Sequence, residues 1–304
     1  MEVASESRSP SAEAQRDRAP VTVRCWGVRG SIPTPGPETV RYGGNTTCVE
    51  VRAGDTRLIF DAGSGIRILG QDLVERGPNK INIFLTHFHW DHIQGFPFFA
   101  PLYDADDTIR VIAPRQSNID VRNLFAGQMG PIYFPVPFSV VAAAMEFEHL
   151  QEGPISLDGA TLQTLKMKHP SNVVGYRVEL GSQIVCFLPD NELDGDMYRV
   201  DSDWDARLLD FVRGADLLIH DAMYTEEEYT HRAGWGHSTF KQAIRLAEAA
   251  DVSRLLFFHH DPRRSDDELD QIVDRLVEDA QARGSALDLS AAREGMDLRL
   301  EGGK

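Results

Sequence analysis

The order of the predicted elements indicates an α/β or α+β fold with β-sheet in the middle. Strand-like runs come first in each half of the chain, and helical patterns follow them. Polar side chains repeatedly come directly after these apolar runs, which is typical of a site built on one edge of a sheet. The chain has 304 residues, of which 42% are hydrophobic, so it can bury one large core or two small ones.

The first half of the chain begins with a segment of different composition. Residues 1–20 are rich in Ser, Glu, Ala, Arg and Pro, which predicts a disordered tail ahead of one domain over residues 21–304. Ser64 is positioned to cap a helix that carries Ile66, Leu69 and Leu73 on one face. Strands are expected at residues 21–26, 46–51, 57–60, 81–86 and 108–112.

The segment from about residue 115 to 150 has many aromatic residues and no clear period. Two interpretations are open: an ordinary packing segment at the edge of the domain, or a flap that covers a site and contacts the substrate.

The second half alternates strands with two well-marked helices. A helix over residues 239–250 has the capping box Thr239 and Gln242, and the last long helix has the capping box Ser265 and Glu268. The last helix has an apolar face at helical period, formed by Leu269, Ile272, Val273, Leu276, Val277 and Ala280. Strands are expected at residues 161–168, 175–180, 183–188, 215–220 and 255–258.

The composition restricts partners and compartment. A formal net charge of −16 and a pI near 5.0 give no general attraction to nucleic-acid backbone or anionic lipid. The three cysteines lie far apart inside apolar runs, which favours reduced core thiols. No stretch has the length of a membrane span and none resembles a signal peptide, so a cytoplasmic protein is expected.

The most informative segment is residues 87–92, His-Phe-His-Trp-Asp-His, which directly follows the apolar run at 81–86. It places three imidazoles and one carboxylate at the end of a predicted buried strand. Neutral imidazole and carboxylate are ligands that zinc, iron and manganese accept. The segment therefore predicts a metal site.

Further potential ligands follow the ends of other predicted strands. Strand ends at one edge of a sheet can converge on one cleft, where loops carry chemistry on a rigid support. One histidine in such a place would be weak evidence, but the arrangement recurs along the chain. The residues concerned are Asp61, His169, Asp190, His220, Asp221, His259 and His260.

This pattern resembles the metallo-β-lactamase-fold hydrolases: H-x-H-x-D-H after a strand, then a later His, a later Asp and a final His. The resemblance covers Val21 to about Leu300. It implies an αββα sandwich, with two mixed sheets flanked by helices and the metals at one sheet edge. It further implies a first metal bound by His87, His89 and His169, a second bound by Asp91, His92 and His259, and Asp190 bridging the two.

Two divalent ions are therefore expected, most simply Zn²⁺, with Mn²⁺ or Fe²⁺ as alternatives. Such a pair ionises a shared water and neutralises an anionic substrate. His259 and His260 should point to opposite sides of a strand end, and His259 is favoured because it directly follows the apolar run. Asp61 and Asp221 could orient ligand imidazoles or merely cap backbone amides.

The reaction is predicted from the turn at residues 234–239, Gly-Trp-Gly-His-Ser-Thr, which precedes a capped helix. A histidine at a helix N-terminus suits contact with a phosphate oxygen. The turn resembles that of the phosphodiesterase branch, including the ribonuclease Z group, in which the histidine assists the leaving group. His237 is thus expected to be catalytic, together with Asp91 and Asp221. The alternative is that His237 only caps the helix or packs against Trp235.

The substrate is expected to be a small phosphodiester, such as a cyclic nucleotide. Ribonuclease Z-type enzymes need a basic surface for tRNA, whereas this chain is acidic and has no Lys/Arg cluster longer than a pair, so long nucleic acid is expected to be an unlikely partner. Arg29 and Arg41 could bind the substrate, or could form loop salt bridges. The alternatives are a hydrolase of a lactone, lactam or thioester, an RNA-processing nuclease, or a non-enzymatic metal protein. The oligomeric state is left open; the resemblance makes a homodimer one option, because the family often dimerises.

Overall fold

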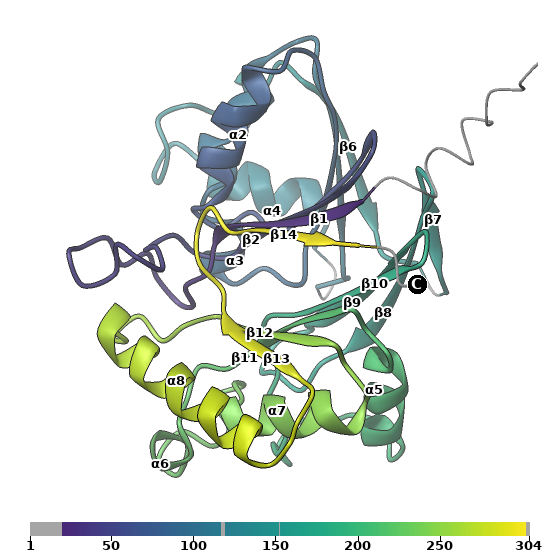
Figure 1. The fold of residues 1–304 in the computed structure, drawn as a ribbon. Helices are drawn as coiled ribbons and strands as arrows, with labels where there is room; N and C mark the ends of the chain where they lie inside the picture. The colour runs from purple at the N-terminus through teal and green to yellow at the C-terminus, as the bar shows by residue number, and fades with distance from the viewer. Residues whose placement is uncertain (1–19, 117–118, 152, 302–304) are drawn as a thin grey trace, which may run out of the picture.

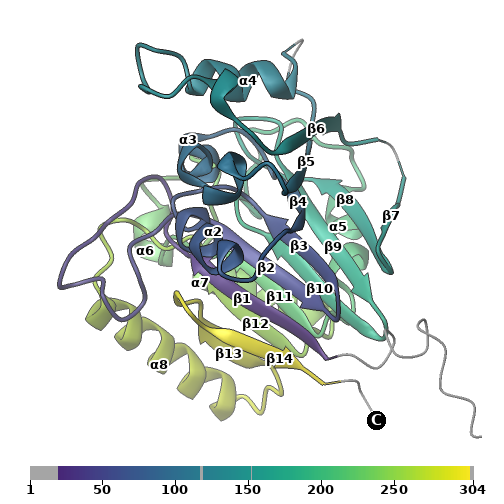
Figure 2. The ribbon, with the colours of Figure 1, turned by 90° about the horizontal axis from the view of Figure 1, so that it is seen from above.

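The computed structural model describes residues 20–116, 119–151 and 153–301. The predicted tail at residues 1–20 lies outside the described residues, apart from Pro20. Two seven-stranded sheets pack face to face, and helices cover both outer faces (Figures 1 and 2). The predicted αββα sandwich is confirmed.

The first sheet is antiparallel on one side and parallel on the other. Pairing is antiparallel from β14 to β3 and parallel from β3 to β6. Its outer face carries α2 (Ile66–Val74), α3 (Trp90–Ile93) and α4 (Val121–Gln128) (Figure 2). The strand order is β14 (Asp297–Leu300), β1 (Val21–Gly27), β2 (Cys48–Ala53), β3 (Thr56–Phe60), β4 (Lys80–Phe84), β5 (Thr108–Ala113) and β6 (Ala144–His149).

The second sheet has the same mixed character. Pairing is parallel from β13 to β10 and antiparallel from β10 to β7. Its outer face carries α5 (Trp204–Val212), α7 (Phe240–Ala249) and α8 (Asp266–Ala282), while α6 (Glu226–Tyr229) is a single turn (Figure 1). The strand order is β13 (Asp288–Ala291), β12 (Arg254–Phe258), β11 (Leu217–Asp221), β10 (Gln183–Leu188), β9 (Val174–Leu180), β8 (Ala160–Lys166) and β7 (Ile155–Leu157).

The central strands are buried on both faces, which explains their uninterrupted apolar sequence. Successive side chains of a strand point to opposite faces. Phe257 therefore packs under the helices of the second sheet, while Phe258 packs between the two sheets. Ile59 and Phe60 divide in the same way between the outer and the central layer of the first sheet.

Both predicted capping boxes are confirmed, because Thr239 with Gln242 and Ser265 with Glu268 bond each other's backbone amides at the starts of α7 and α8. The predicted cap at Ser64 is wrong: α2 begins at Ile66 after Gly65 and has no side-chain cap. The Ser64 hydroxyl instead accepts the amide of Thr46, so it joins this turn to the β1–β2 loop.

All three cysteines are buried and free, as expected for core thiols. No helix among the described residues is both long and apolar enough to cross a lipid bilayer.

The prediction that Arg29 and Arg41 bind substrate is not supported by their surroundings. The Arg29 guanidinium is fully buried and donates to the carbonyls of Gly43, Asp261 and Arg264, beside the Asp266 carboxylate. It is therefore enclosed by protein acceptors and has no surface left for a ligand.

Arg41 is half-exposed and pairs with acidic residues of α8, Asp267 and Asp270. Its backbone amide also donates to Asp266, at 2.6 Å. The loop salt bridge, which was the alternative for both arginines, is the arrangement found. Together these contacts hold the long β1–β2 loop beside the start of α8 (Figure 1).

Asp266→Ala should lower the free energy of unfolding by about 3 kcal/mol, because it leaves the buried Arg29 cation without its carboxylate. Asp267→Ala is the matched control: it removes the neighbouring carboxylate, which is exposed, and should cost less than about 1 kcal/mol. Urea denaturation of the two variants measures the difference. Equal losses would contradict the role assigned to Asp266.

Candidate metal centre

The candidate site lies where the carboxyl ends of strands from both sheets meet. Residues 87–92 follow β4, His169 follows β8, Asp190 follows β10 and His259 follows β12. The structure brings these residues together within a few ångströms, although they come from both halves of the chain.

A first group consists of His87, His89, His169 and Asp190, each offering one ligand atom within 4.8 Å of the others. His169 Nε2 lies 3.3 Å from His89 Nδ1. Asp190 Oδ2 lies 3.8 Å from His87 Nε2 and 3.7 Å from His169 Nε2. These atoms are close enough to share one cation.

A second group consists of Asp91, His92 and His259. Asp91 Oδ2 lies 3.3 Å from His92 Nε2 and 3.1 Å from His259 Nε2. The other oxygen of Asp190, Oδ1, lies 3.1 Å from His92 Nε2 and 3.4 Å from His259 Nε2. The Asp190 carboxylate therefore directs one oxygen to each group.

The residues fit divalent cations. His87 Nε2, His92 Nε2 and Asp190 Oδ1 are buried and have no hydrogen-bond partner among the described residues. Buried polar atoms without partners are costly, and one cation in each ligand group would satisfy these three. The mixture of imidazole and carboxylate suits Zn²⁺, Mn²⁺ or Fe²⁺.

The lowered pKa values of the two carboxylic acids in the site favour cation binding. Burial alone would raise the pKa values of Asp91 and Asp190, but the neighbouring imidazoles hold both well below the usual range. Burial would lower the pKa of His92, but Asp190, Asp91 and Asp61 raise it well above its usual value. Burial lowers the pKa of His169 to about 4. A bound cation would displace the proton from His92, since metal ligation requires the neutral ring.

Two ligand candidates have acceptors on their outward nitrogens. His92 Nδ1 lies 2.8 Å from Asp61, which also accepts the amide of Thr86. His169 Nδ1 lies 2.9 Å from the carbonyl of Gly236. Such partners fix the tautomer and the orientation of the ring. Asp61 is placed as an orienting residue.

His259 faces the cluster and His260 does not. His259 adopts a left-handed conformation with φ of 59°, which directs its Nε2 to Asp91. His260 turns the other way, and its Nε2 bonds the carbonyl of Ala292. His220 is also apart from the cluster, since its Nδ1 lies 2.7 Å from the Asp221 carbonyl.

His237 lies beside the second group, with its ring stacked on His259 at 4.9 Å between centroids. Its Nδ1 is 2.8 Å from the Asp221 carboxylate. Burial would lower the pKa of His237, but Asp221 and the carboxylates of the cluster raise it to about 9. The raised pKa favours the protonated ring, and His237 offers a ring nitrogen within 4.8 Å of ligand atoms of Asp190 and His259. Asp221 positions His237 and is not part of either ligand group.

Gly30 and Ser31, which were not predicted as residues of the site, lie against the second ligand group. The Ser31 amide donates to Asp91 Oδ2 at 2.7 Å, from a left-handed backbone with φ of 64°. A Cβ on Gly30 would lie 2.4 Å from the ring of His259. The loop from residue 27 to 44 is rich in glycine, which could have indicated a close approach to another side chain. Only the fold shows that the ring approaching Gly30 is that of His259.

The segment at 115–150 packs beside the site. Phe125 stacks on Phe96 at 3.9 Å between centroids. The side-chain Nε2 of Gln128 donates to the carbonyl of Ile93, at the end of α3. The tip carries the exposed side chains of Ile132 and Tyr133. The first part is thus a packing segment, and contact of the tip with a substrate stays a prediction.

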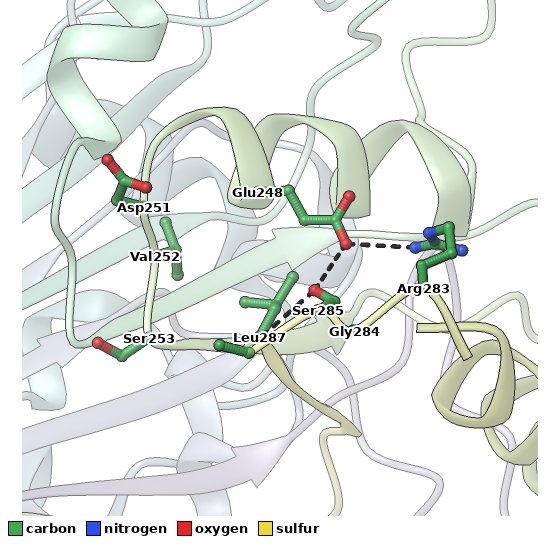
Figure 3. Close-up of a pocket in the computed structure, with 9 residues that line it drawn as sticks. Glu248, Asp251, Val252, Ser253, Arg283, Gly284, Ser285 and Leu287 are labelled. Atoms are coloured by element: carbon green, nitrogen blue, oxygen red, sulfur yellow. Dashed lines mark hydrogen bonds and ion pairs between the residues drawn. The ribbon is translucent and has the colours of Figure 1, made fainter. Parts of the chain in front are cut away.

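A separate hollow lies at the opposite edge of the second sheet, before the starts of β12 and β13 (Figure 3). Glu248 and Asp251 line it, and the Glu248 carboxylate is bonded to Arg283 and Ser285. None of the predicted site residues lines it.

Gly30→Ala should displace the His259 ring and weaken the second ligand group. We expect zinc content after dialysis to fall from about two ions per chain to about one. Gly36→Ala, in the same loop, is the control, because its Cβ would meet nothing within 4 Å. Unchanged zinc content in both variants would contradict the assignment of His259.

Solved structures confirm the architecture. The metallo-beta-lactamase fold protein YhfI from Bacillus subtilis superposes with a TM-score of 0.67 at 20% identity, over 93% of this chain and all of that one. A human tRNase Z, the short form, superposes with a TM-score of 0.61 at 18% identity, over 91% of this chain and 98% of that one.

Relatives in sequence correct one expectation. A ribonuclease Z from Thermoplasma volcanium is 26% identical over 84% of this chain and 90% of its own length, and one from Pyrococcus furiosus is 23% identical over 79% and 86%. The expectation that long nucleic acid is an unlikely partner is therefore wrong. Net charge sums over the whole chain, whereas binding depends on the local field around a site.

The family described as a beta-lactamase superfamily domain matches residues 56–260, which is more than half of the chain. This range runs from the start of β3 to just after β12, and it contains both ligand groups. The chain belongs to the beta-lactamase superfamily.

Proposed function

We propose that this protein is a metal-dependent phosphodiester hydrolase with two divalent cations, held by the first and the second ligand group. The observation that carries the proposal is the division of the Asp190 carboxylate between the two groups. When bound, the cations would neutralise a phosphate and supply an ionised water as nucleophile. Zn²⁺ is the metal proposed, with Mn²⁺ or Fe²⁺ as alternatives.

His237 is proposed as the general acid. Asp221 holds its Nδ1, so the protonated ring can present Nε2 to the leaving oxygen. Hydrolysis of a phosphodiester in RNA or in a cyclic nucleotide expels an alkoxide, which needs a proton. A proton donor would also serve a lactone or a lactam, so the preference for phosphodiesters rests on the sequence relatives, which are named ribonuclease Z.

An RNA phosphodiester is the substrate class proposed first, because the sequence relatives over most of the chain are named ribonuclease Z. A cyclic nucleotide is the second candidate, because the two ligand groups and His237 would act on the phosphodiester itself, whether or not it belongs to a longer chain. Cleavage rates on a 3′-extended tRNA precursor and on cyclic nucleotides separate the two.

The protein loaded with zinc or manganese should hydrolyse bis(p-nitrophenyl) phosphate, and His89→Ala combined with Asp190→Ala should reduce the rate to that of metal-free protein. His231→Ala, an exposed histidine outside the cluster, is the control and should leave the rate unchanged. The release of p-nitrophenolate gives the rates. Full activity in the double variant would overturn the proposal, as would turnover of carbonyl esters but of no phosphodiester.

His237→Ala should affect substrates according to their leaving group. Cleavage of an RNA oligonucleotide should slow roughly a hundredfold or more, because the alkoxide loses its proton donor. Cleavage of bis(p-nitrophenyl) phosphate should slow much less, since p-nitrophenolate leaves without a proton. Equal losses on both substrates would show that His237 is not the acid.

A further inference from the structure

The loop that carries Asp190 also carries Glu192, a glutamate with no exposed surface. Its carboxylate accepts four donors. The amides of Gly234 and Gly236 donate at 2.7 Å each, to different oxygens. The Tyr229 hydroxyl donates to Oε1 at 2.7 Å, and the Tyr198 hydroxyl lies 3.1 Å from Oε2.

Both amides belong to the turn that precedes His237. Gly234 and Gly236 have left-handed backbones, with φ of 87° and 90°. In this conformation their amides converge on one carboxylate, as amides do in anion-binding turns. Glu192 therefore acts as an internal anion that holds the turn in shape.

The same contacts reach the first ligand group. The carbonyl of Gly236 lies 2.9 Å from His169 Nδ1, and the Glu192 amide donates to the carbonyl of Lys168 at 2.8 Å. Glu192 thus contacts both Lys168, which precedes His169 in the chain, and Gly236, whose carbonyl lies against the His169 ring. A Cβ on Gly236 would lie 2.3 Å from the His169 ring, so the turn and the ring are in close contact.

We propose that Glu192 is a positioning residue that fixes the positions of the His169 and His237 imidazoles relative to Asp190. It touches neither substrate nor cation. It acts through the amides of the 234–236 turn, whose carbonyl orients one ring and whose next residue carries the other. The proposal rests on the proposed function for its consequences in catalysis, but its structural part stands without it.

The test compares Glu192→Gln with Tyr229→Phe. Glutamine has the shape of glutamate but only one side-chain oxygen. The side-chain NH₂ group would therefore face the backbone amide of Gly234 or Gly236, which is also a donor. Phenylalanine at 229 removes one hydroxyl contact and keeps both amide contacts. Hydrogen exchange is measured on metal-free protein, so it does not depend on catalysis.

In Glu192→Gln, amides of residues 230–240 should exchange roughly tenfold faster or more, with those of β12 unchanged. Zinc affinity should fall roughly 10- to 100-fold, as when other partners of ligand histidines are removed. The kcat on bis(p-nitrophenyl) phosphate should fall while KM stays within about twofold. Tyr229→Phe should change each of the three measurements clearly less than Glu192→Gln does, because both amide contacts of the turn remain.

Unchanged exchange and zinc affinity in Glu192→Gln would overturn the proposal. If that variant fails to fold, Glu192→Asp is measured in its place: faster exchange confined to residues 230–240 supports the proposal, and uniformly faster exchange overturns it. If the parent protein cleaves no phosphodiester, the proposed function fails, while the exchange comparison still decides the role of Glu192.

Discussion

The candidate site depends on one buried carboxylate shared between two sets of imidazoles. Asp190 stands between the first and the second ligand group, with one oxygen toward each. Such an anion can remain in the protein interior only among compensating groups. The two sheets provide them: the loops after β4 of the first sheet and after β10 and β12 of the second meet, so ligands from distant parts of the chain surround the same point. The packing of the two sheets thus brings imidazoles from both of them around the Asp190 carboxylate.

Much of this arrangement could be predicted because its signals are local. Residues 87–92 carry several ligands in one short stretch, and both capping boxes are readable at fixed spacing. The remaining ligands were predicted from resemblance, since nothing in the spacing of His169 and Asp190 indicates contact. The edge strands β6, β7, β13 and β14 were not predicted, because their apolar patterns are weak and they depend on pairing with their neighbours.

The errors have a common physical cause. Arg29 was expected to bind the substrate, yet it donates to carbonyls of residues more than two hundred positions away. Ser64 was taken for a helix cap, yet its hydroxyl bonds a neighbouring loop. Glu192 was not considered, since a glutamate in a polar stretch carries no mark of burial. In each case tertiary contacts determine what a polar side chain does, and sequence periodicity does not report them.

The order of the strands has a consequence for synthesis. The first sheet takes its edge strand β14 from residues 297–300, which pair with β1 at residues 21–24. While the chain is being made, β1 therefore has an open hydrogen-bonding edge until residues 297–300 are available. Open edges invite pairing with other chains. The last strand of the first sheet thus also closes the edge at which a partly synthesised chain is open to such pairing.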